Sequence, residues 1–415
     1  MKKIKLKQVL KNYKNKHLIQ NDKSYRQVTI SQTGEVSFRG EKHGINIGRK
    51  RQFLIDLKNH PNTLIFIRQG VMKGGIGICP PEVNGCVVTE NMPMFEIVDI
   101  NSEYLLNFIK SPIFKKEVNK LVPIGTAQKA LHENKLLEIE IPYPSEKDQE
   151  KVVKKINSMK NEINELEQNV SYDESLLSKL RQSILSEAVQ GKLIPQNLKD
   201  EPAVELLKKI KKEKGRLIEE RKIRKGKELP VITDDEIPYK LPKGWVWCRL
   251  GDVLEFIYGK GLKKENRISI GKYPVYGSNG IVGNFNKYLT DKKAIIIGRK
   301  GSAGALNISE LPSWTTDVAY YIEESKNLDF KFIFYLLKSL NLESIGKGIK
   351  PGLNRNETYI LPICLPPLPE QRRIVGKVDA LMKFCDELEL RIKENKKGSE
   401  RLMGAVLGEV FKNGE

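Results

Sequence analysis

An internal repeat constrains this sequence more than any other feature. The stretch DQEKVVKKINSMKNEINELEQ, which begins at Asp148, aligns without a gap to EQRRIVGKVDALMKFCDELEL, which begins at Glu370, at an offset of 222 residues. Identical pairs at this offset are Gln149/Gln371, Val153/Val375, Lys155/Lys377, Glu165/Glu387, Leu166/Leu388, Glu167/Glu389, Leu180/Leu402, Leu185/Leu407 and Glu187/Glu409. Since 415 residues are too long for one ordinary core, we expect a tandem duplication with a folded segment in front of each repeated stretch.

Each repeated stretch carries a heptad pattern of apolar residues. A polar residue, Asp173 or Asn395, interrupts the same heptad in both, and buried polar residues in coiled coils tend to fix the register. We therefore predict two helices of about forty residues, roughly 60 Å long, that pair with each other. The alternative is that each helix packs on its own domain as an ordinary amphipathic helix. The seam residues expected in the core are Val152, Ile156, Met159, Ile163, Leu166, Leu177 and Leu180, then Ile374, Val378, Leu381, Leu388, Ile392 and Leu402.

Proline and glycine mark the ends of the predicted helices. Pro144 and the PPLP run at 366–369 stand where each helix begins, and proline is tolerated there because its missing N–H has no helical partner. Gly191 and Pro195 end the first helix, and Pro202 starts a short helix that leads into a solvated basic linker. The predicted domains are a first head (1–142), a first long helix (143–200), a basic helical linker (201–236), a second head (237–365) and a second long helix (366–415).

The two heads repeat more loosely than the helices. Residues 64–70 (LIFIRQG) and 295–301 (IIIGRKG) each read as a buried strand that runs into an arginine, Arg68 or Arg299, and a glycine-rich turn follows both. The pairs Leu131/Leu353 and Asn134/Asn356 return at the offset of 222. Strands, glycine-rich turns and short helices together predict a compact mixed α/β domain in each head.

The net charge of +20 is concentrated in the heads. Residues 1–142 carry +10 and residues 237–365 carry +8, which leaves +2 for the rest of the chain. A chain from a lysine-rich proteome would spread its excess charge evenly, whereas a protein that neutralises phosphates gathers lysine and arginine at its binding surface. The distribution therefore favours a nucleic-acid partner.

The sequence lacks the motifs that catalysis would need. It has no G-x-x-x-x-G-K-[ST] phosphate loop, no N/D-P-P-Y/F amine-methylation motif and no dinucleotide fingerprint around GRKGSAG. The four histidines are far apart, and the five cysteines form no C-x-x-C pair. We expect no catalytic, metal or cofactor site in this chain. With no apolar run of about eighteen residues and no secretory signal, we also expect a cytoplasmic protein.

Four segments resemble the specificity subunits of type I restriction–modification systems. They are LPPLPEQRRIVGKVDALM from Leu365, LRQSILSEAVQGKLIPQN from Leu180, LPKGWVWCRLGDV from Leu241 and PVYGSNGIVG from Pro274. The resemblance covers nearly the whole chain, although the first half matches the family less well. It implies an α+β fold with pseudo-twofold repeat, in which two mixed α/β target-recognition domains are separated by two long helices that form an antiparallel intramolecular coiled coil.

The resemblance also implies partners and a division of labour. Each head would read one half of a bipartite double-stranded DNA site, and the helices would fix the spacing. Two methyltransferase (modification) subunits would dock on the helices, and restriction subunits would complete the nuclease. S-adenosylmethionine, ATP and Mg would be bound by those partner subunits, which methylate adenine.

Direct readout of DNA favours arginine or lysine on guanine and asparagine or glutamine on adenine. For each candidate the alternative is a solvated surface charge or a turn residue, and for Arg68 and Arg299 it is an ion pair within the domain. A coiled-coil scaffold whose basic heads bind RNA or acidic proteins is the competing function. The candidate DNA contacts are Lys42, His43, Arg49, Arg51, Arg68, Lys73, Gln128 and Lys129 in the first head, and Lys263, Lys264, Ser278, Asn279, Arg299, Lys300, Lys350 and Arg355 in the second.

Overall fold

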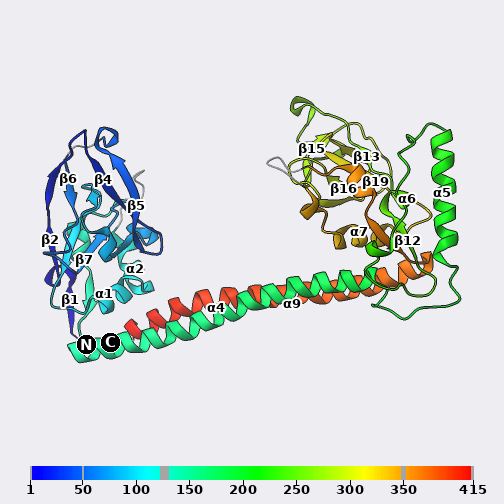
Figure 1. Ribbon diagram of the computed structural model, residues 1–415. Coiled ribbons are helices and arrows are strands. Elements are labelled where there is room, and N and C mark those ends of the chain that lie inside the picture. The colour runs from blue at the N-terminus through cyan, green and yellow to red at the C-terminus, as the bar shows by residue number, and fades with distance from the viewer. Residues whose placement is uncertain (1, 49–50, 122–129, 347–351, 413–415) are drawn as a thin grey trace. The chain divides into compact units, whose positions relative to one another are not determined.

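The chain folds into two compact units. The computed structural model describes residues 2–48, 51–121, 130–346 and 352–412, and of Arg51 and Glu400 it describes only the backbone (Figure 1). One unit comprises Met1–Tyr172 with Ile392–Glu415, and the other comprises Asp173–Arg391. Each unit therefore contains one head and parts of both long helices. No helix within the described residues is long and apolar enough to cross a membrane.

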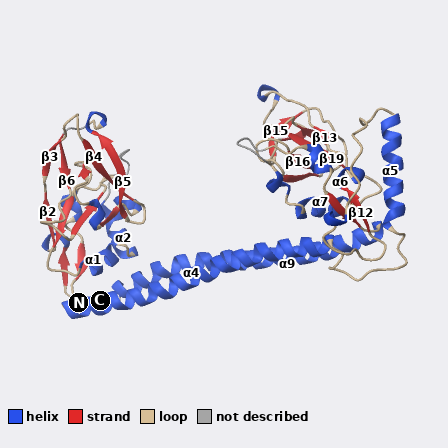
Figure 2. Cartoon of the chain, in the orientation of Figure 1, coloured by secondary structure: helices blue, strands red, loops and turns tan. Residues whose placement is uncertain are grey.

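Within its described residues, the first head contains three antiparallel or mixed sheets and the short α-helices α1 to α3. Figure 2 colours its strands red and its helices blue. The pair β1–β11 joins its two ends, and a four-stranded sheet in the order β2-β10-β7-β8 forms its centre. A separate five-stranded sheet has the order β3-β6-β9-β4-β5. The strands are β1 (Lys3–Lys5), β2 (Leu10–Tyr13), β3 (Lys16–Leu18), β4 (Ser24–Ile30), β5 (Val36–His43), β6 (Arg51–Leu54), β7 (Thr63–Phe66), β8 (Ile76–Ile78), β9 (Val87–Val88), β10 (Met94–Ile97) and β11 (Glu140–Pro142), and the helices are α1 (Ser102–Ile109), α2 (Pro112–Leu121) and α3 (Glu133–Leu136).

The second head repeats the pair and the central sheet. Its pair is β12–β20 and its four-stranded sheet has the order β13-β19-β16-β17, but the further sheet has three strands in the order β15-β14-β18. The linker before it contains α5 (Ala203–Glu219). The elements of the head are β12 (Val246–Arg249), α6 (Leu250–Val253), β13 (Ile257–Tyr258), β14 (Tyr273–Tyr276), β15 (Ile281–Phe285), β16 (Ala294–Gly298), β17 (Leu306–Ser309), β18 (Trp314–Thr315), β19 (Ala319–Glu323), α7 (Phe330–Ser339), α8 (Arg355–Tyr359) and β20 (Pro362–Leu365).

One glutamine in each long helix makes the same hydrogen bonds to its own head. The Gln149 side chain accepts from the Asn101 N–H at 2.9 Å and donates to the Pro144 carbonyl at 3.1 Å. Gln371, which is 222 residues further on, accepts from the Asp329 N–H at 2.9 Å and donates to the Pro366 carbonyl at 3.0 Å. Both glutamines are buried, so these hydrogen bonds take the place of the bonds to water that the buried amide groups have lost. The duplication is thus visible in contacts as well as in sequence.

The two long helices are α4 (Glu146–Val189) and α9 (Leu368–Lys412). In the second unit, Arg181 of α4 donates to Asp386 and Glu389 of α9 at 2.6 and 3.0 Å, and Arg373 pairs with Asp200 beyond the end of α4. Residue numbers therefore rise in α4 as they fall in α9, so the helices run antiparallel there. In the first unit, the last turns of α9 share a hydrophobic cluster with the first turns of α4.

Only one of the two predicted seam positions of α4 is fully buried. Every seventh residue of that position is enclosed, namely Ile156, Ile163, Val170, Leu177 and Ile184. The expectation that all seam leucines lie in the core is wrong for Leu166, Leu180 and Leu402, which are 49%, 41% and 44% exposed. Asp173 and Asn395 are also exposed and are not buried register-setting residues. Two helices bury a narrow stripe along their line of contact, and a seam position at the edge of that stripe stays partly open to solvent.

The segment predicted to be a solvated linker is tied to the second head. Helix α5 begins at Ala203 after Pro202, as the sequence predicts, and buries Leu206 and Ile210. Beyond it, the carbonyls of Pro230 and Val231 each accept a hydrogen bond from Arg249 at 2.9 Å. This arginine is only 3% exposed, and it also pairs with Glu236 at 2.7 Å. The linker is therefore attached to the head along two stretches and is not free in solvent throughout.

Candidate DNA-recognition surfaces of the two heads

Two arginines of the second head that are predicted to contact DNA lie against the same tyrosine ring. The guanidinium carbons of Arg299 and Arg355 lie 5.1 and 5.0 Å from the ring centroid of Tyr258, within the range of a cation–π contact. Backbone contacts hold the two arginine-bearing segments together, because the Leu353 N–H donates to the Arg299 carbonyl at 2.8 Å. The bridge between Lys300 and Gly352 continues this pairing. Residues from β13, the end of β16 and the start of α8 thus form one basic surface.

Carboxylates neutralise only part of this basic surface. Arg299 donates to the Asp317 backbone carbonyl at 3.2 Å. Glu255 lies 3.7 Å from Arg355 and 3.0 Å from Lys214, so one carboxylate serves two cations. Burial raises the pKa of the neighbouring Tyr359, so this tyrosine stays neutral, and its hydroxyl accepts the Phe256 N–H at 2.6 Å. The local excess of positive charge suits an anionic partner.

The turn that carries Ser278 and Asn279 packs against the arginine turn. A Cβ added to Gly298 would lie 2.6 Å from the Ser278 carbonyl oxygen, so only glycine allows this approach of the two backbones. Gly301, at φ +79°, also lies beside the Ser278 side chain, with an ordinary contact distance of 3.6 Å between an added Cβ and Oγ. The structure therefore brings Ser278, Asn279, Arg299 and Lys300 together on adjacent turns.

In the first head, the arginine at the equivalent strand end is held in an ion pair. Arg68 donates to both carboxylate oxygens of Glu133, from Nε at 3.0 Å and from Nη2 at 2.7 Å. The two side chains are 22% and 19% exposed. Burial acts to raise the pKa of Glu133, but its own backbone N–H and the Arg68 guanidinium outweigh burial and hold the pKa below its ordinary value. This is the ion-pair alternative considered for Arg68.

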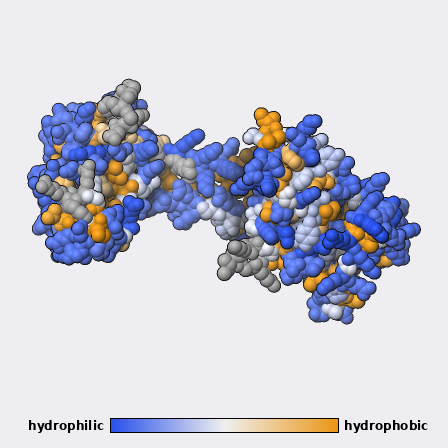
Figure 3. Space-filling view, turned by 90° about the horizontal axis from the view of Figure 1, so that it is seen from above, coloured by the Kyte–Doolittle hydropathy of each residue, from blue (hydrophilic) through white to orange (hydrophobic). Residues whose placement is uncertain are grey.

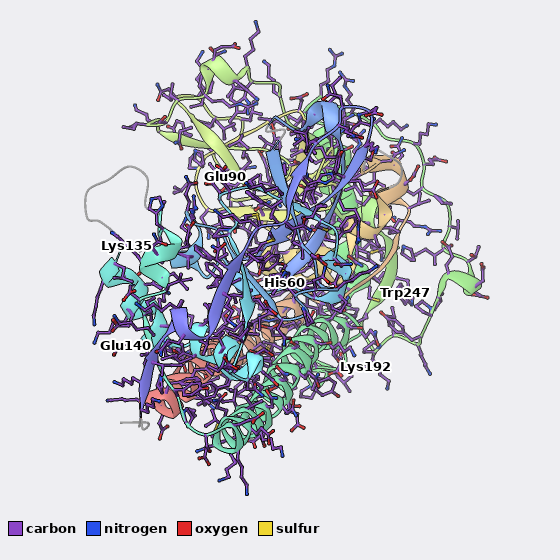
Figure 4. All side chains as sticks on the ribbon, turned by 90° about the vertical axis from the view of Figure 1, so that its left-hand side faces the viewer. His60, Glu90, Lys135, Glu140, Lys192 and Trp247 are labelled. Carbon is purple, nitrogen blue, oxygen red and sulfur yellow. The ribbon has the colours of Figure 1, made fainter. Side chains whose placement is uncertain are left out.

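A cavity of about 110 Å³ lies beside this ion pair. Its lining includes Tyr13, Lys14, Glu90 and both members of the ion pair, so its charged groups balance. The Tyr13 ring stacks on His60 with 3.9 Å between centroids. Figure 4 labels His60 and Glu90 in this head, together with Lys135 on α3.

The remaining described candidates of the first head lie at two separate places. Lys73 lies on the turn before Gly74, where an added Cβ would be 2.1 Å from the carbonyl of Gln32 in the β4–β5 turn. Lys42 and His43 lie at the opposite end of that hairpin, where Lys42 pairs with Tyr25, about 20 Å along the strands. Both side chains are exposed.

Arg49, Gln128, Lys129 and Lys350 lie outside the described residues, as does the side chain of Arg51. Lys263 and Lys264 are exposed in the segment that follows β13.

Sequence reasoning missed the aromatic part of the second surface. Tyr258, which contacts both arginines, lies in a two-residue strand, and a single aromatic residue in so short a strand does not indicate a binding surface. A signal was present at the offset of 222, which matches Glu133 of the first head to Arg355 of the second. The repeat thus places a carboxylate in one head where the other has a guanidinium.

Comparison with known proteins decides the family. The model of the type I restriction modification DNA specificity domain matches residues 242–395. The specificity subunit of the type I restriction enzyme EcoAI from Escherichia coli is 30% identical, and the match covers 81% of this chain and 67% of that protein. The chain belongs to the family of type I restriction enzyme specificity subunits. The specificity subunit of EcoEI, also from Escherichia coli, is 24% identical, with 81% of this chain and 68% of that protein covered.

Solved structures share the fold of this specificity subunit. A chain from a study of complex assembly and conformational transition of the type I R-M system is 18% identical, covers 99% of this chain and 97% of its own, and has a TM-score of 0.65. The HsdS subunit from Thermoanaerobacter tengcongensis is 17% identical, with 100% and 97% covered and a TM-score of 0.52. Members of this family are non-catalytic subunits without a catalytic cofactor of their own.

Proposed function

We propose that this specificity subunit reads a split double-stranded DNA target, with one half read by residues 1–142 and the other by residues 237–365. The observation that carries the proposal is the repeated frame of the two heads. Each head has the same strand pair and four-stranded sheet, and each is bonded to a long helix through an equivalent glutamine, Gln149 or Gln371. The further sheets differ, with five strands in one head and three in the other. A shared frame with different outer parts suits a protein that reads two different half-sites.

The second half-site is proposed to contact the surface around Tyr258. Arg299, Arg355 and Lys300 would supply phosphate or guanine contacts, and Ser278 and Asn279 would reach base edges from the adjacent turn. Lys263 and Lys264, which are exposed after β13, and Lys350, which lies outside the described residues, stay predicted contacts of the second head. In the first head, Lys42, His43, Lys73, Arg49, Arg51, Gln128 and Lys129 stay predicted contacts.

The long helices are proposed to dock two modification subunits, which restriction subunits then join. The support is a set of large apolar side chains that the helices leave exposed in each unit. They are Leu166, Tyr172 and Leu402 in the first unit and Leu176, Leu180, Phe384 and Leu390 in the second. Exposed apolar surface of this kind is typical of protein–protein contact sites. The partner subunits would bind S-adenosylmethionine, ATP and Mg.

The test is to co-express the chain with the methyltransferase gene beside its own and to map adenine methylation across the host genome by long-read sequencing. The proposal predicts one split motif with an unread gap of fixed length. A stable complex that adds no methylation would refute the specificity role and favour a scaffold whose basic heads bind RNA or acidic proteins.

A separate variant tests the docking surface. Phe384→Glu with Leu390→Glu should release a modification subunit, which size-exclusion chromatography with light scattering would detect. Glu394→Ala with Lys397→Ala changes exposed residues of the same helix and is the matched control. Retention of both modification subunits by the first variant would contradict docking at these residues.

A further inference from the structure

The basic segment after α5 has no part in the function proposed above. Residues 221–227 (RKIRKGK) carry five basic side chains and no acidic one. The helices and linker together have a net charge of only +2, so their total does not reveal this local concentration of positive charge. Its basic side chains, Arg221, Lys222, Arg224, Lys225 and Lys227, are all exposed.

Helix α5 fixes the front of this segment on the second head. Its buried residues Leu206 and Ile210 face inward. Lys214 donates to the Gly251 carbonyl at 2.7 Å and pairs with Glu255 at 3.0 Å. Lys211 adds an ion pair with Asp252 at 3.0 Å. The helix is therefore held on the head by both apolar and charged contacts.

Arg249 fixes the chain behind the segment. Its guanidinium donates to the carbonyls of Pro230 and Val231 at 2.9 Å each, and to Glu236 at 2.7 Å. The basic segment is thus a short loop attached at both ends. Since a loop that is already held in place loses less freedom on binding, its charges are better prepared to bind than those of a free tail.

The first residue of the segment has a backbone conformation that favours glycine. Arg221 has φ 55°, and the N–H groups of Lys222 and Ile223 both donate to the Leu217 carbonyl, at 2.9 and 3.3 Å. This is the left-handed end of a helix, where glycine is the usual residue. Arginine at this place adds a positive charge at the cost of backbone strain.

The segment faces the side of the second unit that carries the reading turns. Figure 1 shows the end of α5 away from α9, on the side where β13 and β15 also lie. Seen from that side, the surface at this margin is mostly hydrophilic (Figure 3). Among the described residues from 204 to 231, the exposed large hydrophobic side chains are Val204 and Val231, one at each end, and none lies within the basic segment. Protein interfaces have an apolar or aromatic centre, so this surface suits a polyanion better than an acidic protein.

We propose that residues 221–227 bind backbone phosphates of the duplex that flanks the second half-site, outside the sequence that is read. The inference rests on the proposed function, because it requires DNA on the second head. The contact is independent of base sequence and adds affinity that falls as salt rises.

The experiment measures DNA affinity of the complex with co-expressed modification subunits, on duplexes that carry the mapped target. One duplex ends just past the second half-site, and the other continues for about two helical turns, roughly 20 base pairs. The variant Arg221→Gly with Arg224→Gln, Lys225→Gln and Lys227→Gln should bind the long duplex about tenfold or more weakly near 0.1 M salt. Its salt slope should fall by about 0.9 for each phosphate that the variant no longer neutralises. On the short duplex it should equal the wild type.

The control removes four positive charges from the same unit outside the segment, by Lys199→Gln, Lys208→Gln, Lys209→Gln and Lys326→Gln. It should keep the wild-type preference for the long duplex. A segment variant that behaves like this control overturns the inference, and so does an equal loss on both duplexes. Loss of the restriction subunit at unchanged DNA affinity would assign the segment to a protein partner instead. In each of these cases the mapped methylation motif persists. The phosphate-binding role of residues 221–227 would then be wrong while the proposed function still holds.

Arg221→Gly alone separates binding from folding. Because glycine fits the left-handed conformation, this variant should unfold at the same or a higher temperature while binding the long duplex several-fold more weakly. A lower unfolding temperature together with weaker binding would make Arg221 a structural residue and would overturn its assignment.

Discussion

Arg68 and Arg299 end equivalent strands, yet the two heads surround them with opposite charges. In the first head Glu133 accepts two hydrogen bonds from Arg68. In the second head the position equivalent to Glu133 is Arg355, and both arginines contact Tyr258. The repeated frame thus fixes where the side chains meet, and single residue differences decide whether the meeting point is neutral or basic. A substitution at such a position can therefore change the charge that a head presents to its partner while the fold stays the same.

The largest effect should come from giving the second head the charge pattern of the first. Arg355→Glu would place a carboxylate near Arg299, where it removes one positive charge and neutralises another. We expect target affinity to fall by about 100-fold near 0.1 M salt, as when about two phosphates are no longer neutralised. Fluorescence anisotropy with the mapped target measures this, and Glu357→Gln, an exposed change on the same short helix, is the control. Unchanged affinity would remove Arg355 from the DNA contacts.

Removal of Arg68 should destabilise the first head more than removal of Arg299 destabilises the second. Arg68→Ala leaves the largely buried Glu133 carboxylate unpaired, at a cost of about 1–3 kcal/mol. Adding Glu133→Gln should recover part of this loss, whereas Arg299→Ala should weaken DNA binding with little change in unfolding. Urea unfolding of each variant measures the difference. Equal destabilisation by both alanine variants would contradict the contrast between the heads.

Tyr258 should have a smaller effect that depends on its ring. Tyr258→Ala removes two cation–π contacts worth about 0.5–1 kcal/mol each at exposed sites, so affinity should fall about fivefold to thirtyfold. Tyr258→Phe keeps the ring and should bind almost as the wild type does. If the phenylalanine and alanine variants bind equally weakly, the hydroxyl group and not the ring positions the arginines.

The smallest effect concerns pH. The pKa of Glu133 is lowered in the folded protein, so its ion pair stabilises the first head above the ordinary pKa of 4.5 and is lost as pH falls through the lower value. Arg299 instead donates to a backbone carbonyl, which does not titrate. Glu133→Gln should therefore remove part of the loss of stability below about pH 4.5, as measured by thermal unfolding across that range. An identical pH profile for the variant would show that the pair contributes nothing to stability.

The repeat allowed much of the frame to be predicted. The offset of 222 pointed to Gln149 and Gln371 and to the two long helices, and the looser repeat of the heads pointed to the buried strands at residues 64 and 295. It could not tell which seam position faces the partner helix, because Leu166 and Leu180 fit the heptad as well as residues that are enclosed. That choice depends on how the two helices pack.

The site was less predictable than the frame. Arg299 and Arg355 were named from residue type and turn position, but their meeting on Tyr258 depends on contacts between strands far apart in sequence. The same is true of Arg68, because an ion pair with a residue 65 positions away leaves no local pattern. Residue types suggested the chemistry, and only the fold determined which charges are neutralised.

The most direct test of the two-headed reader is an exchange of one head. Residues 237–365 would be replaced by the equivalent head of another specificity subunit of the family, and adenine methylation would be mapped again in the same host with the same modification subunit. We predict that one half of the motif changes while the other half stays the same. A motif that is unchanged, or one in which both halves change, would contradict the assignment of one half-site to each head.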